Sequence, residues 1–155
     1  MRTAIFPGTF DPFTVGHQSI VERALPLVDR MIVAIGINSQ KKPLISVEKR
    51  LQMIAAIFAD EPKVEVMSYE GLTMDFAKKV NAQTILRGVR NALDFEYESS
   101  IARINWKLSG IDSMFLLTHE EHSSISSSIV RDLLIHGGDV SDFIPKNVNI
   151  NTYLD

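Results

Sequence analysis

The chain contains no cysteine. This absence excludes disulfide bonds, thiolate nucleophiles and zinc–thiolate sites, so any chemistry must use oxygen and nitrogen groups. The chain also lacks an apolar run approaching the roughly 20 residues of a membrane span, and no secretion signal is recognisable where Met1-Arg2 leads into a short apolar segment. We therefore expect a water-soluble cytoplasmic protein that does not bind membranes.

An excess of positive charge is also missing, because the formal net charge is -3. Nucleic-acid-binding proteins generally present a basic face to the phosphate backbone, so this composition argues against a nucleic-acid partner. Any anion site must instead be a local basic cluster. The sequence shows no internal repeat, low-complexity tract or linker in its 155 residues, which predicts a single domain over residues 1–155.

Short apolar segments alternate with segments of helical period along the whole chain. The alternation predicts a Rossmann-like α/β sandwich, doubly wound, with a five-stranded parallel sheet and ligands at the carboxyl ends of the strands. The expected strands are Thr3–Pro7, Met31–Ile37, Val64–Ser68, Thr84–Arg87 and Ser113–Thr118. The expected helices are Gly16–Leu25, Val47–Phe58, Leu72–Val80, Ala92–Leu108 and Ser127–His136, with a further helix after Pro145.

Residues at the helix ends support these boundaries. Ser46 and Ser126 stand where a side chain can cap the second and fifth helices. Gly137-Gly138 follow the fifth helix, where a left-handed cap favours glycine.

The segment from Gly8 to His17 connects the first strand to the first helix, the usual place for a nucleotide in an open α/β sheet. Gly8 permits a tight turn, and Gly16 keeps the first turn of the helix free of a side chain. Thr14 and His17 add two side-chain donors to the free amides of the helix N-terminus, which favours a phosphate. Neither the dinucleotide fingerprint nor the P-loop motif is present, so a different phosphate-binding mode is required.

Three further loops at the same edge of the predicted sheet carry basic or hydroxyl groups. Lys41-Lys42-Pro43 follows the second strand, Arg87-Gly88-Val89-Arg90 the fourth, and Ile125–Ser128 the fifth. Arginine suits phosphate because its planar fork makes paired hydrogen bonds, and serines at a helix start add hydroxyls and free amides. Together these loops predict a polyanion site on an otherwise acidic protein.

The remaining acidic and aromatic groups are less informative. Asp11 stands in a Phe-Asp-Pro turn, and we interpret it as a conformational residue. The acidic run Asp94–Glu98 can serve the helix dipole or a ligand, and both readings remain open. We expect Trp106 and the phenylalanines other than Phe10 to lie in the core.

These motifs, in this order, resemble the bacterial phosphopantetheine adenylyltransferase family, a branch of the nucleotidylyltransferase superfamily with its [HT]-x-G-H signature at Thr14–His17. The resemblance spans Ala4 to about Pro145. It implies transfer of AMP from ATP to 4'-phosphopantetheine, giving 3'-dephospho-coenzyme A and pyrophosphate, with Mg²⁺ as cofactor and a homohexameric assembly.

The resemblance also implies site residues. His17, Thr14 and Lys41 would be catalytic, with His17 stabilising the transition state. The acceptor would contact Thr9, Lys41, Thr73 and Arg87. ATP would contact Thr9, Phe10, His17, Gly88, Val89, Arg90, Glu98, His122, Ser123, Ser124, Ile125, Ser126, Ser127 and Ser128. No protein ligand for the metal is assigned.

Two positions depart from many members of the family. His122 replaces a common tryptophan, and Ile135 replaces a common basic residue. A histidine can still stack on a base, and Arg131 lies one turn before Ile135 on the same helix. We expect these differences to change ligand affinity rather than the reaction.

No catalytic triad is recognisable, and the implied reaction does not need one, because a phosphomonoester is largely dianionic at pH 7 and attacks directly.

The residues alone leave alternative functions open. A nucleotidylyltransferase acting on nicotinate mononucleotide or glycerol 3-phosphate would use a similar site, and a nucleotide-sensing module could use the fold without turnover. An RNA-binding or tRNA-charging fragment is disfavoured by the acidic net charge.

Overall fold

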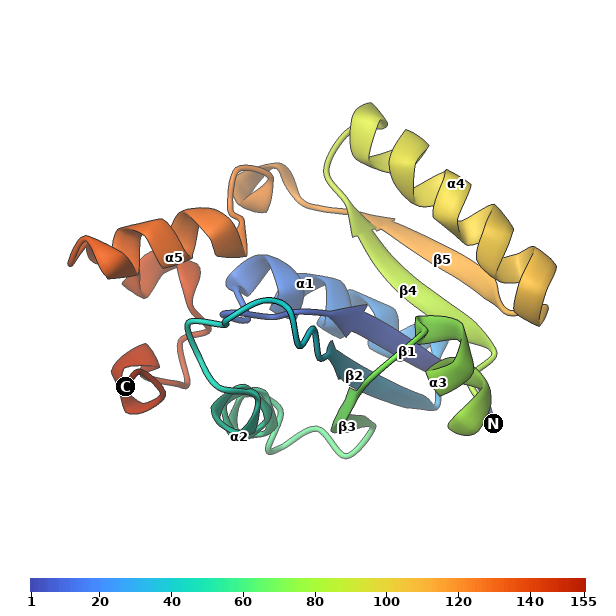
Figure 1. Ribbon diagram of the computed structural model, residues 1–155, viewed down its shortest axis with the longest axis horizontal. Coiled ribbons are helices and arrows are strands. Elements are labelled where there is room, and N and C mark those ends of the chain that lie inside the picture. The colour runs from blue at the N-terminus through green and yellow to red at the C-terminus, as the bar shows by residue number, and fades with distance from the viewer.

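The computed structural model describes residues 1–155 and contains one five-stranded sheet with helices on both faces (Figure 1). All strand pairs are parallel, in the order β3-β2-β1-β4-β5. The predicted Rossmann-like fold is therefore confirmed. The strands are β1 (Thr3–Gly8), β2 (Arg30–Gly36), β3 (Val64–Tyr69), β4 (Thr84–Val89) and β5 (Asp112–Leu117).

Five α-helices connect or follow the strands, within two residues of the predicted bounds at either end. They are α1 (Val15–Ala24), α2 (Val47–Ile57), α3 (Thr73–Lys79), α4 (Ala92–Ser109) and α5 (Ser127–Ile135). The predicted caps are confirmed: Ser46 accepts from the amide of Lys49, and Ser126 from that of Ile129. Gly137 has a φ of 73°, in the left-handed region that favours glycine.

Strand alternation divides the core into two layers. Ala4 and Phe6 of β1 face the larger cluster, which includes buried residues of α1, α2 and α5, whereas Ile5 faces the smaller cluster with Phe76 of α3. The central strands β1 and β2 are buried on both faces, as expected of parallel strands covered by helices. None of the helices has the length and hydropathy that a membrane span requires.

The chain reverses its direction of winding beside β1. After β3 at one edge of the sheet it returns to β4, on the other side of β1. The connections that leave β1 and β4 therefore run in opposite directions from the carboxyl ends of these two strands. Ligands bind at this position in open α/β sheets.

Three sequence-based expectations are wrong. No α-helix follows Pro145, since the C-terminal segment forms only a short 3₁₀ turn at Ile150–Thr152. Trp106 is 59% exposed and Phe95 50% exposed, so neither is a core residue. Both lie on α4, a helix without a single buried residue. Helical period alone did not reveal that this helix covers the sheet only loosely.

Candidate functional site

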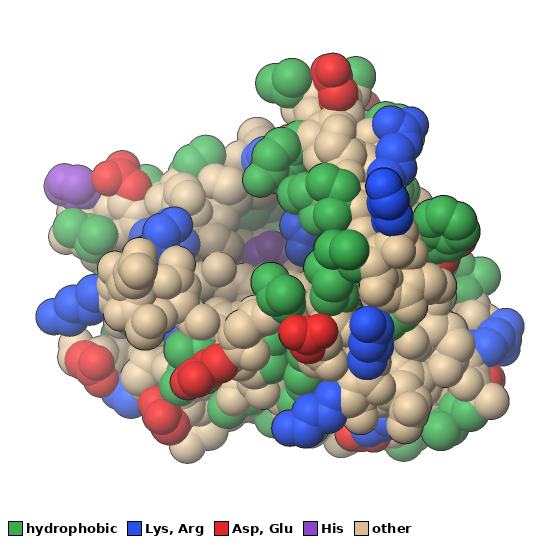
Figure 2. Space-filling view, turned by 45° about the vertical axis from the view of Figure 1, so that its right-hand side comes forward, with side chains coloured by type: hydrophobic (Ala, Val, Ile, Leu, Met, Phe, Trp, Pro, Cys, Tyr) green, Lys and Arg blue, Asp and Glu red, His purple; other side chains and the backbone are tan.

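A cavity of about 800 Å³ lies at the carboxyl ends of the central strands. Figure 2 looks into this hollow, with a histidine and basic side chains in its depth. All four predicted loops contribute to its wall. The predicted site residues in the wall are Thr9, Phe10, Thr14, His17, Lys41, Arg87, Gly88, Arg90, His122, Ile125, Ser126, Ser127 and Ser128.

The wall of the cavity is strongly basic although the protein is acidic. Asp11 is its only carboxylate, whereas six lysine and arginine side chains line it: Lys41, Lys42, Arg50, Arg87, Arg90 and Arg131. A concave surface with charges of one sign concentrates the field and attracts ligands of the opposite sign. The cavity therefore suits a ligand with several phosphate groups.

Thr14 and His17 cap each other at the start of α1. The amide of Thr14 donates to Nδ1 of His17 across 3.0 Å, and the amide of His17 donates to Oγ1 of Thr14 across 3.4 Å. This reciprocal capping box fixes the imidazole ring over the helix N-terminus. Because Nδ1 accepts a hydrogen bond, a neutral imidazole must carry its proton on Nε2.

The surroundings of His17 keep it neutral. Its ring packs against Phe6, Phe10 and Phe13, with centroid distances of 6.2, 5.0 and 5.2 Å. The pKa of His17 is lowered from 6.5 to about 4, mainly by burial and further by the positive charge of Arg87. At neutral pH the residue is therefore a hydrogen-bond donor through Nε2, to which no other protein group is hydrogen-bonded, and not a cation.

Gly8 provides room for one of these rings. A Cβ at Gly8 would lie 2.7 Å from Cζ of Phe10, a distance that forces the ring to move. Phe10 has a φ of 52° and is only 4% exposed, so its ring supports His17 in the core and offers little surface for stacking on a base.

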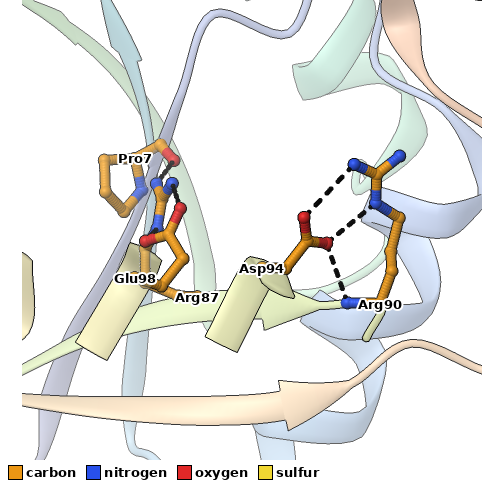
Figure 3. A network of polar contacts seen from close by, with 5 residues as sticks. All are labelled: Pro7, Arg87, Arg90, Asp94 and Glu98. Carbon is orange, nitrogen blue, oxygen red and sulfur yellow. Dashed lines mark hydrogen bonds and ion pairs between the residues drawn. The ribbon is translucent and has the colours of Figure 1, made fainter. Parts of the chain in front are cut away.

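Arg87 is held from two sides. Glu98 of α4 accepts from Nε at 2.8 Å and from Nη2 at 2.7 Å, and the carbonyl of Pro7 accepts from Nη1 at 3.0 Å (Figure 3). Arg87 was expected at the end of the fourth strand, whereas Gly88 and Val89 were expected in the loop after it; all three belong to β4. The guanidinium thus extends from a rigid strand and retains N–H groups that no protein atom accepts.

Arg90 follows the end of β4 and is held in a similar way. Asp94, in the first turn of α4, accepts from Nε of Arg90 at 2.9 Å and from its backbone amide at 3.1 Å (Figure 3). The hydrogen bonds from Arg90 lower the pKa of Asp94. Two carboxylates one turn apart on α4 therefore orient the two arginines of β4 and its loop.

The Asp11-Pro12 turn connects α5 to the rest of the site. Arg131 donates to the carbonyl of Asp11 at 2.8 Å, and Ser127 donates to the carbonyl of Pro12 at 2.8 Å. The side chain of Ser128 accepts from Arg131. These contacts place the first turn of α5, with its free amides, over the loop that follows β1.

Five of the predicted site residues lie outside the cavity wall: Thr73, Val89, Glu98, Ser123 and Ser124. Thr73 bonds to the hydroxyl of Tyr69, Val89 is buried in β4, and Ser123 donates to the carbonyl of Glu120. Glu98, expected to contact ATP, accepts hydrogen bonds from Arg87. Ile135, one of the two departures from the family pattern, is exposed and also outside the wall.

His122 is in the wall and carries the only buried side-chain nitrogen or oxygen without a hydrogen-bond partner, Nδ1. Its Cβ would be 3.7 Å from a Cβ placed on Gly16, so it stands directly against the first turn of α1. Buried polar atoms are normally paired, and this one lies beside a ligand cavity.

Arg50 is the principal residue of the wall that sequence reasoning missed. It is 4% exposed and donates to the carbonyls of Ile45 and Thr9, at 2.9 and 2.7 Å. A signal was available, because Arg50 shares a helical face with the buried Met53, Ile54 and Ile57 of α2. An arginine among the apolar residues of a helix face is expected to be buried and to bond to specific polar partners.

The carboxylates near the cavity are all engaged. Asp11 accepts from the amides of Leu44 and Ile45, Glu98 from Arg87 and Asp94 from Arg90. No group of three histidine, aspartate or glutamate residues could hold a metal ion. These residues do not fit a magnesium ion bound by the protein alone, since Mg²⁺ requires oxygen ligands in near-octahedral geometry.

Known proteins match the chain over most of its length. Residues 5–133 match the family described as Cytidylyltransferase-like. The phosphopantetheine adenylyltransferase of Bacteroides thetaiotaomicron is 54% identical over 97% of this chain and 100% of its own length. That of Flavobacterium johnsoniae is 54% identical over 97% of this chain and 99% of its own length. The chain belongs to the phosphopantetheine adenylyltransferase family. The predicted family membership is therefore confirmed.

The fold of this phosphopantetheine adenylyltransferase family member also occurs in a larger protein. A crystal structure of a bifunctional NMN adenylyltransferase/ADP ribose pyrophosphatase from Francisella tularensis superposes with a TM-score of 0.74 at 19% identity. The match covers 95% of this chain and 46% of that one. At this identity the likeness concerns the fold alone.

Proposed function

We propose that the protein transfers AMP from ATP to 4'-phosphopantetheine, giving 3'-dephospho-coenzyme A and pyrophosphate. The observation that carries the proposal is the neutral His17, which lines a basic cavity beside the helix N-terminus and leaves Nε2 without a partner in the protein. The names of the relatives support the choice of acceptor.

In the proposed step, an oxygen of the acceptor phosphate attacks the α-phosphorus of ATP. The new P–O bond forms as the bond between the α-phosphorus and the oxygen bridging to the β-phosphate breaks, and pyrophosphate leaves with that electron pair. The acceptor is largely dianionic at pH 7, so no general base is required. Catalysis then depends on positioning the reactants and on stabilising the charge of the transition state.

The proposed roles follow from where the side chains lie. His17 and Thr14 donate to oxygens of the α-phosphate, and Lys41, whose side chain makes no hydrogen bond or ion pair within the protein, bridges this phosphate and the acceptor. Arg87 holds the acceptor phosphate, together with Thr9. Arg90 and the serines at the start of α5 bind the departing pyrophosphate.

Magnesium enters this proposal as part of the nucleotide substrate. The engaged carboxylates leave the ATP phosphates as its main ligands. The nitrogen and amide donors of the cavity then bind the phosphate oxygens that the ion leaves free.

We further propose a cytoplasmic homohexamer. The exposed face of α4 supports assembly, because Leu93, Tyr97, Ile101, Ile104 and Leu108 form an apolar stripe at helical spacing. Figure 2 shows hydrophobic side chains gathered along this side of the molecule.

Sedimentation should give a mass near six times 17.4 kDa. The double substitution Ile101→Glu with Ile104→Glu should lower the sedimenting mass. A monomer at micromolar concentration would contradict the assembly.

The function is tested by pyrophosphate release from Mg²⁺ and ATP with 4'-phosphopantetheine, nicotinate mononucleotide, glycerol 3-phosphate or no acceptor. Release that depends on 4'-phosphopantetheine supports the proposal. Release with another acceptor keeps the chemistry and changes the substrate. ATP binding without release would favour a sensor.

A further inference from the structure

Asp11 and Arg50 are buried, oppositely charged residues beside the cavity, and the reaction proposed above assigns neither of them a role. They are 3% and 4% exposed. Asp11 belongs to the loop after β1, which carries the donors of Thr14 and leads to His17. Arg50 belongs to α2 and lies behind the loop of residues 37–46, which carries Lys41.

Asp11 bonds to the backbone of the second loop, and Arg50 bonds to the backbone of both loops. Both carboxylate oxygens of Asp11 accept from the second loop, Oδ2 from the amide of Leu44 at 2.8 Å and Oδ1 from that of Ile45 at 2.9 Å. Arg50 donates through Nε to the carbonyl of Ile45 at 2.9 Å and through Nη1 to that of Thr9 at 2.7 Å. Ile45 is therefore held at both its amide and its carbonyl.

Burying the charges of Asp11 and Arg50 costs free energy, which argues that their contacts serve the function of the protein. Burial lowers the pKa of Arg50, and the nearby charge of Asp11 opposes this effect. Buried charges are retained where their hydrogen bonds are complete and specify one geometry. Here the geometry specified is the distance between the loop that carries Lys41 and the loop that leads to His17.

We infer that Asp11 and Arg50 form a loop clamp, a pair of positioning residues that sets Lys41 against His17 in the transition state. Lys41 is exposed, makes no side-chain hydrogen bond or ion pair and stands three residues before Leu44, so the position of its backbone determines where its ammonium group can reach. The inference rests on the proposed function, because it assumes that Lys41 and His17 act on one phosphate.

A double-mutant cycle on kcat tests the clamp. Arg50→Lys keeps the charge but cannot bond to both carbonyls as a planar fork does. We expect this substitution to lower kcat by roughly 10- to 100-fold, the range for small misplacement of a catalytic group. In a Lys41→Ala background the same substitution should lower kcat by no more than about 2-fold, since the residue that it positions is already absent. A full additional loss in that background would overturn the inference.

Asp11→Asn provides an independent variant, because it disturbs the same loop from the opposite side and should show the same dependence on Lys41. Arg30→Lys is the matched control. Arg30 makes an equivalent fork to Glu65, at 2.7 and 2.8 Å, at the other end of β2, and its substitution should leave kcat unchanged.

A second measurement needs no turnover. The amides of Leu44 and Ile45 donate to Asp11, so their hydrogen exchange reports the clamp directly. We expect exchange at least about 10-fold faster in Arg50→Lys and unchanged in Arg30→Lys. Unchanged exchange in Arg50→Lys would overturn the inference, whereas the pyrophosphate release of the wild type tests the proposed function separately.

Discussion

The backbone amide of Thr14 donates to Nδ1 of His17 across 3.0 Å, and this bond decides which ring nitrogen can meet a ligand. With Nδ1 engaged, the neutral ring donates through Nε2. The aromatic rings around His17 and the charge of Arg87 keep it neutral at physiological pH. A neutral donor can stabilise charge that develops on a phosphate oxygen without retaining the product as strongly as a cation would.

Replacing His17 by asparagine should therefore affect the chemical step. We expect kcat to fall by roughly 10²- to 10³-fold, the usual loss of one oxyanion donor, with little change in the Kd of ATP. Steady-state kinetics and calorimetric titration of ATP check the two values separately. Equal losses in kcat and in ATP binding would show that His17 merely binds the ground state.

The low pKa of His17 also predicts a pH dependence of stability in the absence of ligand. Between about pH 4 and 6.5 the unfolded chain binds a proton at this residue that the folded protein does not. The contribution is thus complete above pH 6.5, is lost as the pH falls toward 4, and amounts to roughly 3 kcal/mol. Urea unfolding of the wild type and His17→Gln across this range should show a smaller slope in the variant.

The two arginines of β4 and its loop should separate the substrates. Arg87→Lys keeps a charge beside Glu98 but loses the fork, and it should raise the KM of the acceptor by roughly 10-fold while that of ATP changes little. Arg90→Ala should instead raise the KM of ATP. Two-substrate kinetics distinguish the assignments, and a reversed pattern would exchange them.

Replacing His122, whose buried Nδ1 has no hydrogen-bond partner, should stabilise the protein without ligand but weaken its affinity for ATP. His122→Phe removes a buried, unpaired Nδ1, so the free energy of unfolding without ligand should rise by about 1 kcal/mol. If a bound nucleotide supplies the missing partner, the KM of ATP should rise as well. A variant that is less stable would show that a water already satisfies this nitrogen.

Position 8 must be glycine because the ring of Phe10, which packs against His17, occupies the space of a Cβ. Gly8→Ala places a Cβ 2.7 Å from Cζ of Phe10, so the ring must move within a packed core. We expect a loss of about 1–3 kcal/mol of stability and a lower kcat. Thermal unfolding and kcat can be measured beside Gly110→Ala, whose Cβ meets no atom but whose φ of 72° strains the backbone alone.

The sequence predicted the features that depend on local pattern. Apolar runs and helical period located all strands and α-helices, and the loops after β1, β2, β4 and β5 met at one cavity because parallel strands end at one edge. The role of Arg50 depends instead on two loops closing over it, a long-range contact that no local pattern contains. The exposure of Trp106 likewise depends on how α4 lies against the sheet.

Glu98 illustrates the same limit within the site. Its position in the motif indicated a ligand contact, which stays a prediction. The motif did not indicate that its carboxylate also accepts from the guanidinium of Arg87, eleven residues earlier on a different element. Motifs identify which residues act together, whereas the partner of each side chain is decided by packing.

The central claim, direct transfer of AMP to 4'-phosphopantetheine, is tested most directly by following the α-phosphorus of labelled ATP. After incubation with Mg²⁺ and 4'-phosphopantetheine, we expect the label in 3'-dephospho-coenzyme A, with one pyrophosphate released for each labelled product. Label recovered as free AMP, or in another acceptor when several are supplied together, would contradict it.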